Sequence, residues 1–304
     1  MADERFFPPS AFASPPEEYA SYERSRVVVL PIPYDSTTTA RAGARDGPGA
    51  IIDASEDMEL YDLGLGFEPY RWGIHTLAEL APHSGSAEAT IDRVEAVVAE
   101  LLDDGKFVVT LGGEHTVAVG AARAHARRTP GLSVLAIDAH ADLRDSYLDS
   151  PYNHACTLRR ILEAAPVTQV GLRSAEAEEA ALIRERDLAF YSPQAYRGLA
   201  GGPGEVAARL SDAVYVTIDL DGLDPSQMAA VGTPEPGGLL WDDVVELLAA
   251  VAAERRPGGR PFGRIVGFDV TELAPAEGPR ACAQLAAKLT YRLIGLALGP
   301  AGEA

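Results

Sequence analysis

The chain has 304 residues, with 26 Lys and Arg against 45 Asp and Glu, which gives a formal net charge of −19. Because 47% of the residues are hydrophobic and 23% are charged, the composition excludes a disordered chain and supplies enough apolar side chains for a sizeable core. The acidic balance argues against general binding to nucleic acid or to anionic membranes, since both depend on Lys and Arg. A small, cationic partner is compatible with this charge.

The N-terminal segment and the cysteines indicate the compartment. Residues 1–25 contain acids and prolines and lack the basic start and apolar centre of a signal peptide. We expect an N-terminal arm over residues 1–25, either mobile or in contact with another subunit, and one domain over residues 26–304. Cys156 and Cys282 lie far apart and outside any CxxC spacing, which predicts reduced thiols in a cytoplasmic protein. No stretch reaches the roughly 18 uncharged apolar residues of a membrane span.

Seven short apolar runs, rich in Val and Ile, predict buried strands. In chain order they cover residues 26–33, 106–113, 132–140, 167–172, 187–191, 213–221 and 263–270. Amphipathic stretches between them predict helices, among them residues 86–105, 241–256 and 281–299. Because strand and helix alternate without a low-complexity linker, we predict one three-layer α/β domain with a mostly parallel sheet. Ligands of such sheets bind beyond the carboxyl ends of the strands.

Polar side chains follow three of these runs. The run at 132–140 leads into Asp-Ala-His-Ala-Asp, whose acidic and imidazole side chains lie at every second residue and would point to one side of an extended chain. The run at 213–221 ends in Asp-Leu-Asp, and the run at 106–113 leads into Glu-His at the start of a predicted helix. Together these strand ends present six candidate metal ligands: His115, Asp138, His140, Asp142, Asp219 and Asp221.

Four carboxylates cannot all stay ionised within a few ångströms of one another unless cations neutralise them. Two divalent ions would do so, and oxygen-rich coordination with some imidazole suits Mn²⁺. A centre with two ions roughly 3.5 to 4 Å apart lowers the pKa of a bridging water toward neutrality. The six residues therefore predict a hydrolase with two Mn²⁺ ions.

Each of these motifs, taken alone, also has an interpretation other than this metal centre. A single His beside a buried strand is more often a hydrogen-bonded core residue than a ligand, and residues 219–222 resemble the DxDG motif of phosphatases with an aspartate nucleophile. That motif would leave the acids and the His of residues 138–142 unexplained, so we favour the metal centre. His75, His83 and His125 lie in no motif, and we predict surface or structural roles for them, with His125 on an exposed helix face.

Several segments in combination resemble the signature segments of the ureohydrolases, the arginase and agmatinase family. They are PIPYD with ARAGARDGPGAI (31–35 and 40–51), GGEHT (112–116), AIDAHADLRD (136–145), TIDLDGLDP with GTPEPGG (217–225 and 232–238) and FDVTELAP (268–275). The resemblance extends over residues 26–298. It implies an α/β/α domain around an eight-stranded parallel sheet, a binuclear Mn²⁺ site, and a homo-oligomer that is a trimer or a hexamer.

The resemblance also implies a role for each ligand. Asp138 and Asp219 would bridge the two ions. His115 and Asp142 would bind the first ion, and His140 and Asp221 would bind the second.

Three residues acquire catalytic roles by the same resemblance. A metal-bridging hydroxide would attack the guanidinium carbon of the substrate, and Asp142 would hold this hydroxide and the tetrahedral intermediate. Glu272 would pair with the guanidinium, because a carboxylate matches its planar N–H donors bidentately. His154 would pass a proton to the leaving amine. The products would be urea and an amine, which is putrescine if the substrate is agmatine. Without the resemblance, Glu272 would be interpreted as a helix-cap or surface carboxylate and His154 as a loop histidine.

The segment before His154 bears on the choice of substrate. Arginases carry a Ser-Gly-Asn type of segment there, which binds the carboxylate and α-amine of arginine, whereas residues 149–153 read Asp-Ser-Pro-Tyr-Asn. The segment resembles the agmatinase-like members, and Asp145 and Asp149 could face the distal ammonium of agmatine. Arg144 does not fit this interpretation: facing the site it would repel a polyamine and could bind a carboxylate, whereas paired with either acid it would be structural.

Our first hypothesis is a manganese-dependent hydrolase of polyamine metabolism that releases urea from agmatine or a close guanidino amine. A hydrolase of guanidino acids or formimino acids, and a ureohydrolase of aminopropylagmatine, stay open as alternatives. A non-catalytic metal-binding subunit is a remote third, since all six inferred ligands, Glu272 and His154 are present. Nickel or another ion could replace manganese at a similar ligand set.

Overall fold

The computed structural model of the chain describes residues 10–253 and 264–301. Within them, eight strands form one parallel sheet in the order β2-β1-β3-β8-β7-β4-β5-β6. The strands are β1 (Val27–Ile32), β2 (Ile74–Thr76), β3 (Phe107–Gly112), β4 (Ser133–Ile137), β5 (Val167–Val170), β6 (Ala189–Tyr191), β7 (Val214–Asp219) and β8 (Ile265–Thr271). The predicted α/β fold with an eight-stranded parallel sheet is therefore confirmed.

All seven predicted runs contain a strand, and β2 is an additional one. It lies at the edge of the sheet and pairs with β1 through three residues. Among these three, Ile74 is the fully buried one. A segment this short carries no run of apolar residues, and for that reason the sequence pattern did not indicate it.

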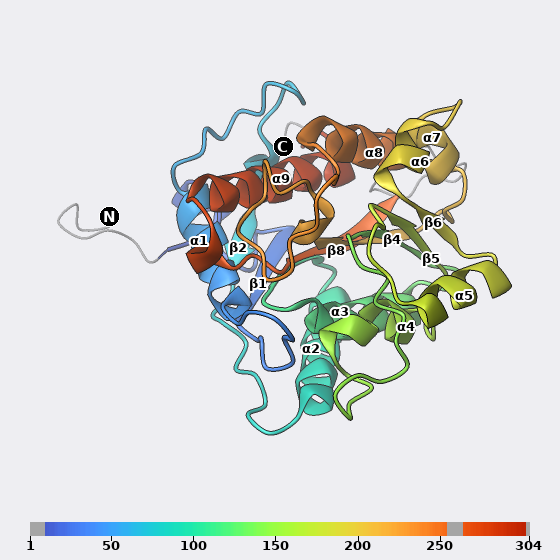
Figure 1. Cartoon of the computed structure of the whole chain (residues 1–304). Coiled ribbons are helices and arrows are strands. Elements are labelled where there is room, and N and C mark those ends of the chain that lie inside the picture. The colour runs from blue at the N-terminus through green and yellow to red at the C-terminus, as the bar shows by residue number, and fades with distance from the viewer. Residues whose placement is uncertain (1–9, 254–263, 302–304) are drawn as a thin grey trace.

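Helices cover both faces of the sheet (Figure 1). One layer contains α1 (Gly47–Ser55), α8 (Trp241–Ala253) and α9 (Ala281–Leu298), with the short α6 (Pro193–Arg197) and α7 (Pro203–Ala207) near α8. The other contains α2 (Ala87–Asp103), α3 (Ala118–Arg128), α4 (Thr157–Ile161) and α5 (Ala177–Glu185). None of the described helices is long and apolar enough to cross a membrane.

All three helices predicted by residue range are present among the described residues. The hydroxyl of Ser86 accepts a hydrogen bond from Ala89 N at 3.1 Å and so caps α2. Gly105, with φ +74°, follows the end of this helix. Helix α9 agrees with the prediction to within one residue. Of the range predicted for α8, residues 254–256 lie outside the described part of the chain.

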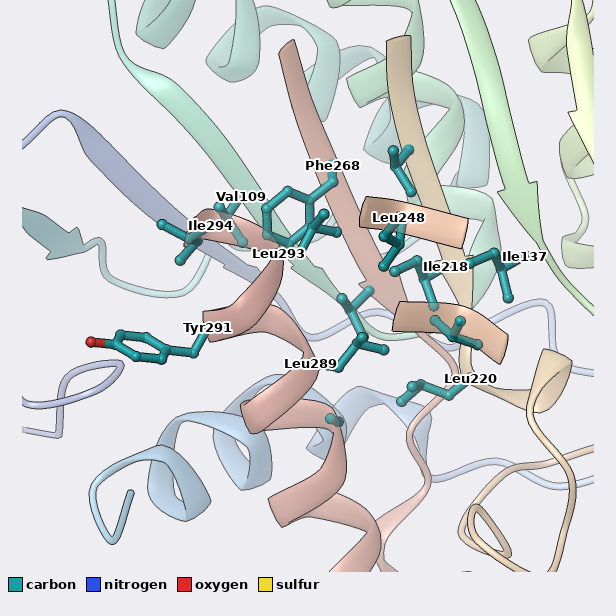
Figure 2. Close-up of a cluster of buried hydrophobic side chains, with 14 of the residues drawn as sticks. Val109, Ile137, Ile218, Leu220, Leu248, Phe268, Leu289, Tyr291, Leu293 and Ile294 are labelled. Atoms are coloured by element: carbon teal, nitrogen blue, oxygen red, sulfur yellow. The ribbon is translucent and has the colours of Figure 1, made fainter. Parts of the chain in front are cut away.

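Each face of the sheet packs into its own apolar core, because parallel strands covered by helices are buried on both faces. Every residue of β1, β3, β4, β5 and β7 is buried. Figure 2 shows the side of α8 and α9, where Phe268 and Ile218 of the sheet belong to one cluster with Leu248, Leu289 and Leu293 of these helices. Two cores that enclose the sheet fix the positions of its strand ends.

Residues 10–25 pack against the domain. Phe12 is fully buried, and its N–H donates to Thr76 Oγ1 at 2.9 Å. The N–H of Ala13 donates to Ser55 Oγ at 2.7 Å. In this part of the predicted arm the structure shows a packed segment instead of a mobile one, because burying an aromatic ring stabilises it. Residues 1–9 lie outside the described residues.

Candidate metal centre

The predicted site residues gather at the carboxyl ends of four adjacent central strands, β3, β8, β7 and β4. His115 lies shortly after β3, Glu272 directly follows β8, Asp219 ends β7 and Asp138 directly follows β4. Parallel strands end at one edge of the sheet, so segments far apart in the chain meet there.

His115 is fully buried and faces three carboxylates. Its Nδ1 lies 3.1 Å from Asp142 Oδ2, 3.3 Å from Asp138 Oδ2 and 3.6 Å from Asp219 Oδ2. Its backbone N–H donates to Glu272 Oε1 at 2.7 Å. Ligand atoms of His115, Asp138 and Asp219 lie within 4.8 Å of one another, a spacing at which they could hold one cation.

A second group consists of Asp138, His140 and Asp221, whose ligand atoms also lie within 4.8 Å of one another. His140 Nδ1 is 2.9 Å from Asp221 Oδ2 and 3.9 Å from Asp138 Oδ1. The carboxylate of Asp221 accepts hydrogen bonds from Ala139 N and Thr233 Oγ1, each at 3.1 Å. Asp138 is common to both groups, which is the position that a bridging ligand requires.

The surroundings of Asp138 test whether a cation fits. Asp138 is fully buried, and its Oδ2 accepts no hydrogen bond from the residues that the structure describes. A buried carboxylate oxygen without a donor is costly, and a cation would satisfy it. Burial and the charge of Asp142 raise the pKa of Asp138, and burial and the charge of Asp221 raise the pKa of Asp219. Clustered carboxylates with imidazole nitrogens therefore fit divalent metal ions.

Asp142 and Glu272 have left-handed backbone conformations, with φ of 48° and 67°. Such a conformation is unfavourable for a residue other than glycine and often marks a functional site. At Asp142 the chain turns, so the extended alternation predicted for residues 138–142 is wrong at its last position. The carboxylate of Asp142 nevertheless reaches His115, because the turn directs it back toward β3. Glu272 is anchored by its own N–H, which donates to Gly113 O at 2.7 Å.

His154 lies between Glu272 and the loop that follows β1. Its Nδ1 is 3.5 Å from Glu272 Oε1, and its Nε2 is 3.0 Å from Thr39 Oγ1. The backbone N–H of His154 donates to Thr37 Oγ1 at 3.1 Å, and the N–H of Thr37 donates to Glu114 Oε2 at 2.7 Å. Burial opposes protonation of the ring, but the hydrogen bond and charge of Glu272 raise the pKa of His154 to about 9. This raised pKa favours the protonated form of the ring.

Five of the predicted site residues border a cavity of about 210 Å³: His140, Asp142, His154, Asp219 and Asp221. Its lining includes Asp142, Asp221 and His154 on the side of the candidate ligands, and Arg144 and Glu176 farther out. The cavity is large enough for a small molecule to reach the carboxylates. Glu272 is not among the lining residues, and its contact with the His154 ring connects it to the cavity.

The chain matches the model of the arginase family over residues 25–295. The chain belongs to the arginase family. It is 38% identical to the N(1)-aminopropylagmatine ureohydrolase of Synechocystis sp., covering 94% of this chain and 96% of that protein. It is 33% identical to the agmatinase of Bacillus anthracis, covering 85% and 87%. The crystal structure of the agmatine ureohydrolase of Thermoplasma volcanium is similar, with a TM-score of 0.84 at 33% identity over 96% of this chain and 95% of that chain.

Membership in the arginase family confirms the predicted resemblance and makes the protein a hydrolase. Several residues that hold the candidate ligands in place were not predicted from the sequence. His115 Nε2 lies 2.9 Å from Thr217 Oγ1, which donates to Asp269 Oδ1 at 2.8 Å. The guanidinium of Arg173 donates to Asp221 O at 2.7 Å and to neighbouring backbone carbonyls. Polar residues inside the apolar runs of β7 and β8 were a signal for Thr217 and Asp269, whereas Arg173 lies in no motif.

Arg144 and Asp145, near the candidate metal centre, have contacts other than those expected. Arg144 pairs with Glu176 at 3.0 Å, and not with Asp145 or Asp149. Asp145 is exposed, pairs with Arg160 at 2.6 Å and does not line the cavity described above, so it does not face a substrate there. The prediction that a structural Arg144 pairs with Asp145 or Asp149 is wrong. Its partner, Glu176, follows β5, and no spacing in the sequence links it to Arg144.

The prediction for His125 is wrong. His125 is 2% exposed and lies on the buried face of α3, with its ring centroid 4.6 Å from that of Tyr215 on β7. Its Nδ1 lies 2.9 Å from Ala121 O within the same helix. The helix turns this face toward the sheet because small alanines surround the histidine and allow close packing.

Proposed function

We propose that this protein hydrolyses a guanidino amine to urea and an amine at a centre of two Mn²⁺ ions. The observation that carries the proposal is the position of Asp138 in two groups of ligand atoms at once. Two divalent cations bound there would neutralise the clustered carboxylates and lower the pKa of a water molecule toward neutrality.

The contacts support a ligand set of six residues. Asp138 would be shared, with His115 and Asp219 in one group and His140 and Asp221 in the other. Asp142 would complete the first group, since its Oδ2 lies 3.1 Å from His115 Nδ1. Asp219 as a second bridging ligand stays a prediction.

The protein's own groups would orient the substrate and move protons. The Glu272 carboxylate offers a bidentate match to the planar N–H donors of a guanidinium. Asp142 lines the cavity and would accept a proton from the attacking water. His154, whose pKa is raised by Glu272, would donate a proton to the leaving amine. Thr39 would hold the His154 ring through its contact with Nε2.

A guanidino amine is the substrate that the relatives favour. The relatives reported above are named for N(1)-aminopropylagmatine and for agmatine, and both compounds lack the carboxylate of arginine. Residues 149–153 also lack the Ser-Gly-Asn type of segment expected of an arginase. We therefore propose agmatine or its aminopropyl derivative, which would yield putrescine or spermidine together with urea.

Urea release by the Mn²⁺-loaded full-length chain tests this function. The panel contains agmatine, N1-aminopropylagmatine, arginine, 4-guanidinobutyrate and 3-guanidinopropionate. We expect kcat/KM for at least one of the two amines to exceed that for arginine and for both acids by about tenfold or more, which corresponds to about 1.4 kcal/mol. Absence of urea from every compound would contradict the proposal, and a preference for the acids would favour the guanidino-acid alternative.

A further inference from the structure

Arg144 is a cation in the wall of a cavity for which we propose a cationic substrate, and its contacts are informative. Its Nη2 lies 3.0 Å from Glu176 Oε1, and its Cζ lies 4.4 Å from the centroid of the Tyr147 ring. All three residues line the cavity of about 210 Å³ beside the candidate metal ligands, which we call the inner cavity. An aromatic face and a carboxylate together form a general binding site for organic cations. The guanidinium of Arg144 thus occupies a cation site made by Tyr147 and Glu176.

This cation site lies where two cavities meet. Arg144, Glu176 and Glu179 line the inner cavity beside the candidate metal ligands, and they also line an outer groove of about 770 Å³. The acids of the outer groove outnumber its bases: Asp145, Glu176, Glu178, Glu179 and Glu185 against Arg144 and Arg159. A polycation that extends outward from the metal centre would therefore reach the Arg144–Glu176 pair and then enter an acidic groove.

Glu176 is the acid at this junction that can exchange its partner. Glu179 is buried, and its two carboxylate oxygens accept hydrogen bonds from Leu143 N and Glu176 N, each at 2.8 Å. The Glu176 side chain is 62% exposed and that of Arg144 is 31% exposed. An ion pair this exposed to solvent is weak, so another cation can replace Arg144.

We propose that Glu176 and Tyr147 form a distal-ammonium subsite and that Arg144 is its displaceable resident cation. The inference rests on the proposed function and narrows it to guanidino polyamines long enough to reach the junction, such as N1-aminopropylagmatine. The distal ammonium of such a substrate takes the place of the Arg144 guanidinium. A substrate of this length that ends in a carboxylate is disfavoured, because its carboxylate would meet Glu176.

Glu176→Gln tests the subsite, because it removes the charge and keeps the size and the acceptor oxygen of the side chain. The readout is the specificity ratio, kcat/KM for N1-aminopropylagmatine divided by kcat/KM for agmatine. We expect this ratio to fall about tenfold, the loss of one charge-assisted contact, mainly through KM of the longer substrate. Glu100→Gln is the matched control, since Glu100 is an exposed acid of α2 that lines neither cavity. The control should leave the ratio unchanged.

Arg144→Ala removes the cation that occupies the subsite and leaves the Glu176 carboxylate in place. Freeing Glu176 from its resident cation should raise the specificity ratio. A ratio that Glu176→Gln leaves unchanged would overturn the proposal. So would an Arg144→Ala variant that selectively loses turnover of 4-guanidinobutyrate, because Arg144 would then bind a substrate carboxylate.

A binding measurement separates failure of the subsite from failure of the proposed function. Calorimetry compares spermidine with putrescine on the unaltered protein and on Glu176→Gln. We expect tighter binding of spermidine to the unaltered protein and a smaller difference on the variant. If no guanidine releases urea but this pattern holds, the subsite stands and the proposed function fails. Equal binding of the two amines to the unaltered protein would overturn the subsite even if urea is released.

Discussion

His115 and His125 are both buried, and their neighbours give them opposite protonation. Burial opposes protonation of His115, but the contact with Asp142 and the charges of Asp138 and Asp142 raise its pKa. Burial among apolar groups lowers the pKa of His125 to about 4. The carboxylates around His115, and not burial as such, distinguish a candidate metal ligand from a structural histidine.

The hydrogen bond to Thr217 should strengthen metal binding by His115. If Nδ1 binds a cation, Nε2–H donates to Thr217 Oγ1, whose hydroxyl donates to Asp269. This chain fixes the tautomer and the orientation of the ring. For Thr217→Val we expect metal affinity to fall about 10- to 100-fold, measured by titration of the chelator-stripped protein with Mn²⁺.

The conservative variant Thr217→Ser is the control for this prediction. Serine keeps the hydroxyl, so metal affinity should stay near that of the unaltered protein. If the valine and serine variants weaken metal binding equally, packing of β7 is responsible and the hydrogen-bonded chain is not.

At the scale of elements, the contact of α3 with β7 and β8 should make the protein sensitive to acid. A Cβ at Gly267 would collide with the His125 ring, so this ring packs directly on the sheet. The pKa of His125 is about 4 in the folded protein and about 6.5 in an unfolded chain. The unfolded chain therefore binds more protons between these values, and stability falls as pH drops from about 6.5 to about 4.

His125→Gln removes this titration. Its free energy of unfolding, measured by urea denaturation between pH 4 and 7, should vary less with pH than that of the unaltered protein. Between pH 7 and pH 4, the free energy of unfolding of the unaltered protein should fall by up to about 3 kcal/mol more than that of the variant, at about 1.4 kcal/mol per pKa unit. An identical pH dependence in the two proteins would show that the pKa of His125 is the same in the folded and the unfolded protein, and would contradict this prediction.

An ion pair connects the segment after α1 to α9. Asp62 is fully buried, and its Oδ1 accepts a hydrogen bond from Arg292 Nη2 at 2.6 Å. Burial opposes ionisation of Asp62, yet Arg292 and Lys288 hold its pKa below the usual range. We expect Asp62→Asn to lower the free energy of unfolding by about 3 kcal/mol, because the cations lose their buried partner.

The exposed pair between Asp57 and Arg280, at 2.7 Å, is the matched control. Both side chains are largely in solvent, so Asp57→Asn should cost less than about 1 kcal/mol. Equal losses in the two variants would contradict the role assigned to the buried pair.

At this scale, the sequence predicted the elements that carry long apolar patterns. The buried strands and the helices α2, α8 and α9 were predictable because each shows a repeating pattern. Strand β2 and the turn at Asp142 were not, because each depends on a few residues held by tertiary contacts. The buried face of α3 was missed because arginines around His125 suggested an exposed surface.

At the scale of the whole molecule, the site combines predictable residues with unpredictable partners. The six candidate ligands follow strands, so their convergence was predictable from the rule that ligands bind at the carboxyl ends of a parallel sheet. The strand order β3-β8-β7-β4, which places Glu272 beside His115, cannot be deduced from spacing in the chain. The pairing of Arg144 with Glu176 likewise depends on where β4 and β5 lie in the folded sheet.

Metal binding should stabilise the whole fold, and more strongly at higher pH. The pKa values of Asp138 and Asp219 are raised by burial and neighbouring carboxylates, so protons compete with metal ions as pH falls. We expect Mn²⁺ to raise the Tm of the chelator-stripped protein more at pH 8 than at pH 6. A shift that is equal at both values would indicate binding elsewhere.

The most direct test of the account measures urea release as chelator-stripped protein is titrated with Mn²⁺. The substrate is agmatine or N1-aminopropylagmatine, and the control is Asp138→Asn, which removes the shared ligand. The account predicts activity that rises with metal and saturates at two ions per chain, and a variant that stays inactive throughout. Full activity after chelation, or full activity of Asp138→Asn, would contradict it.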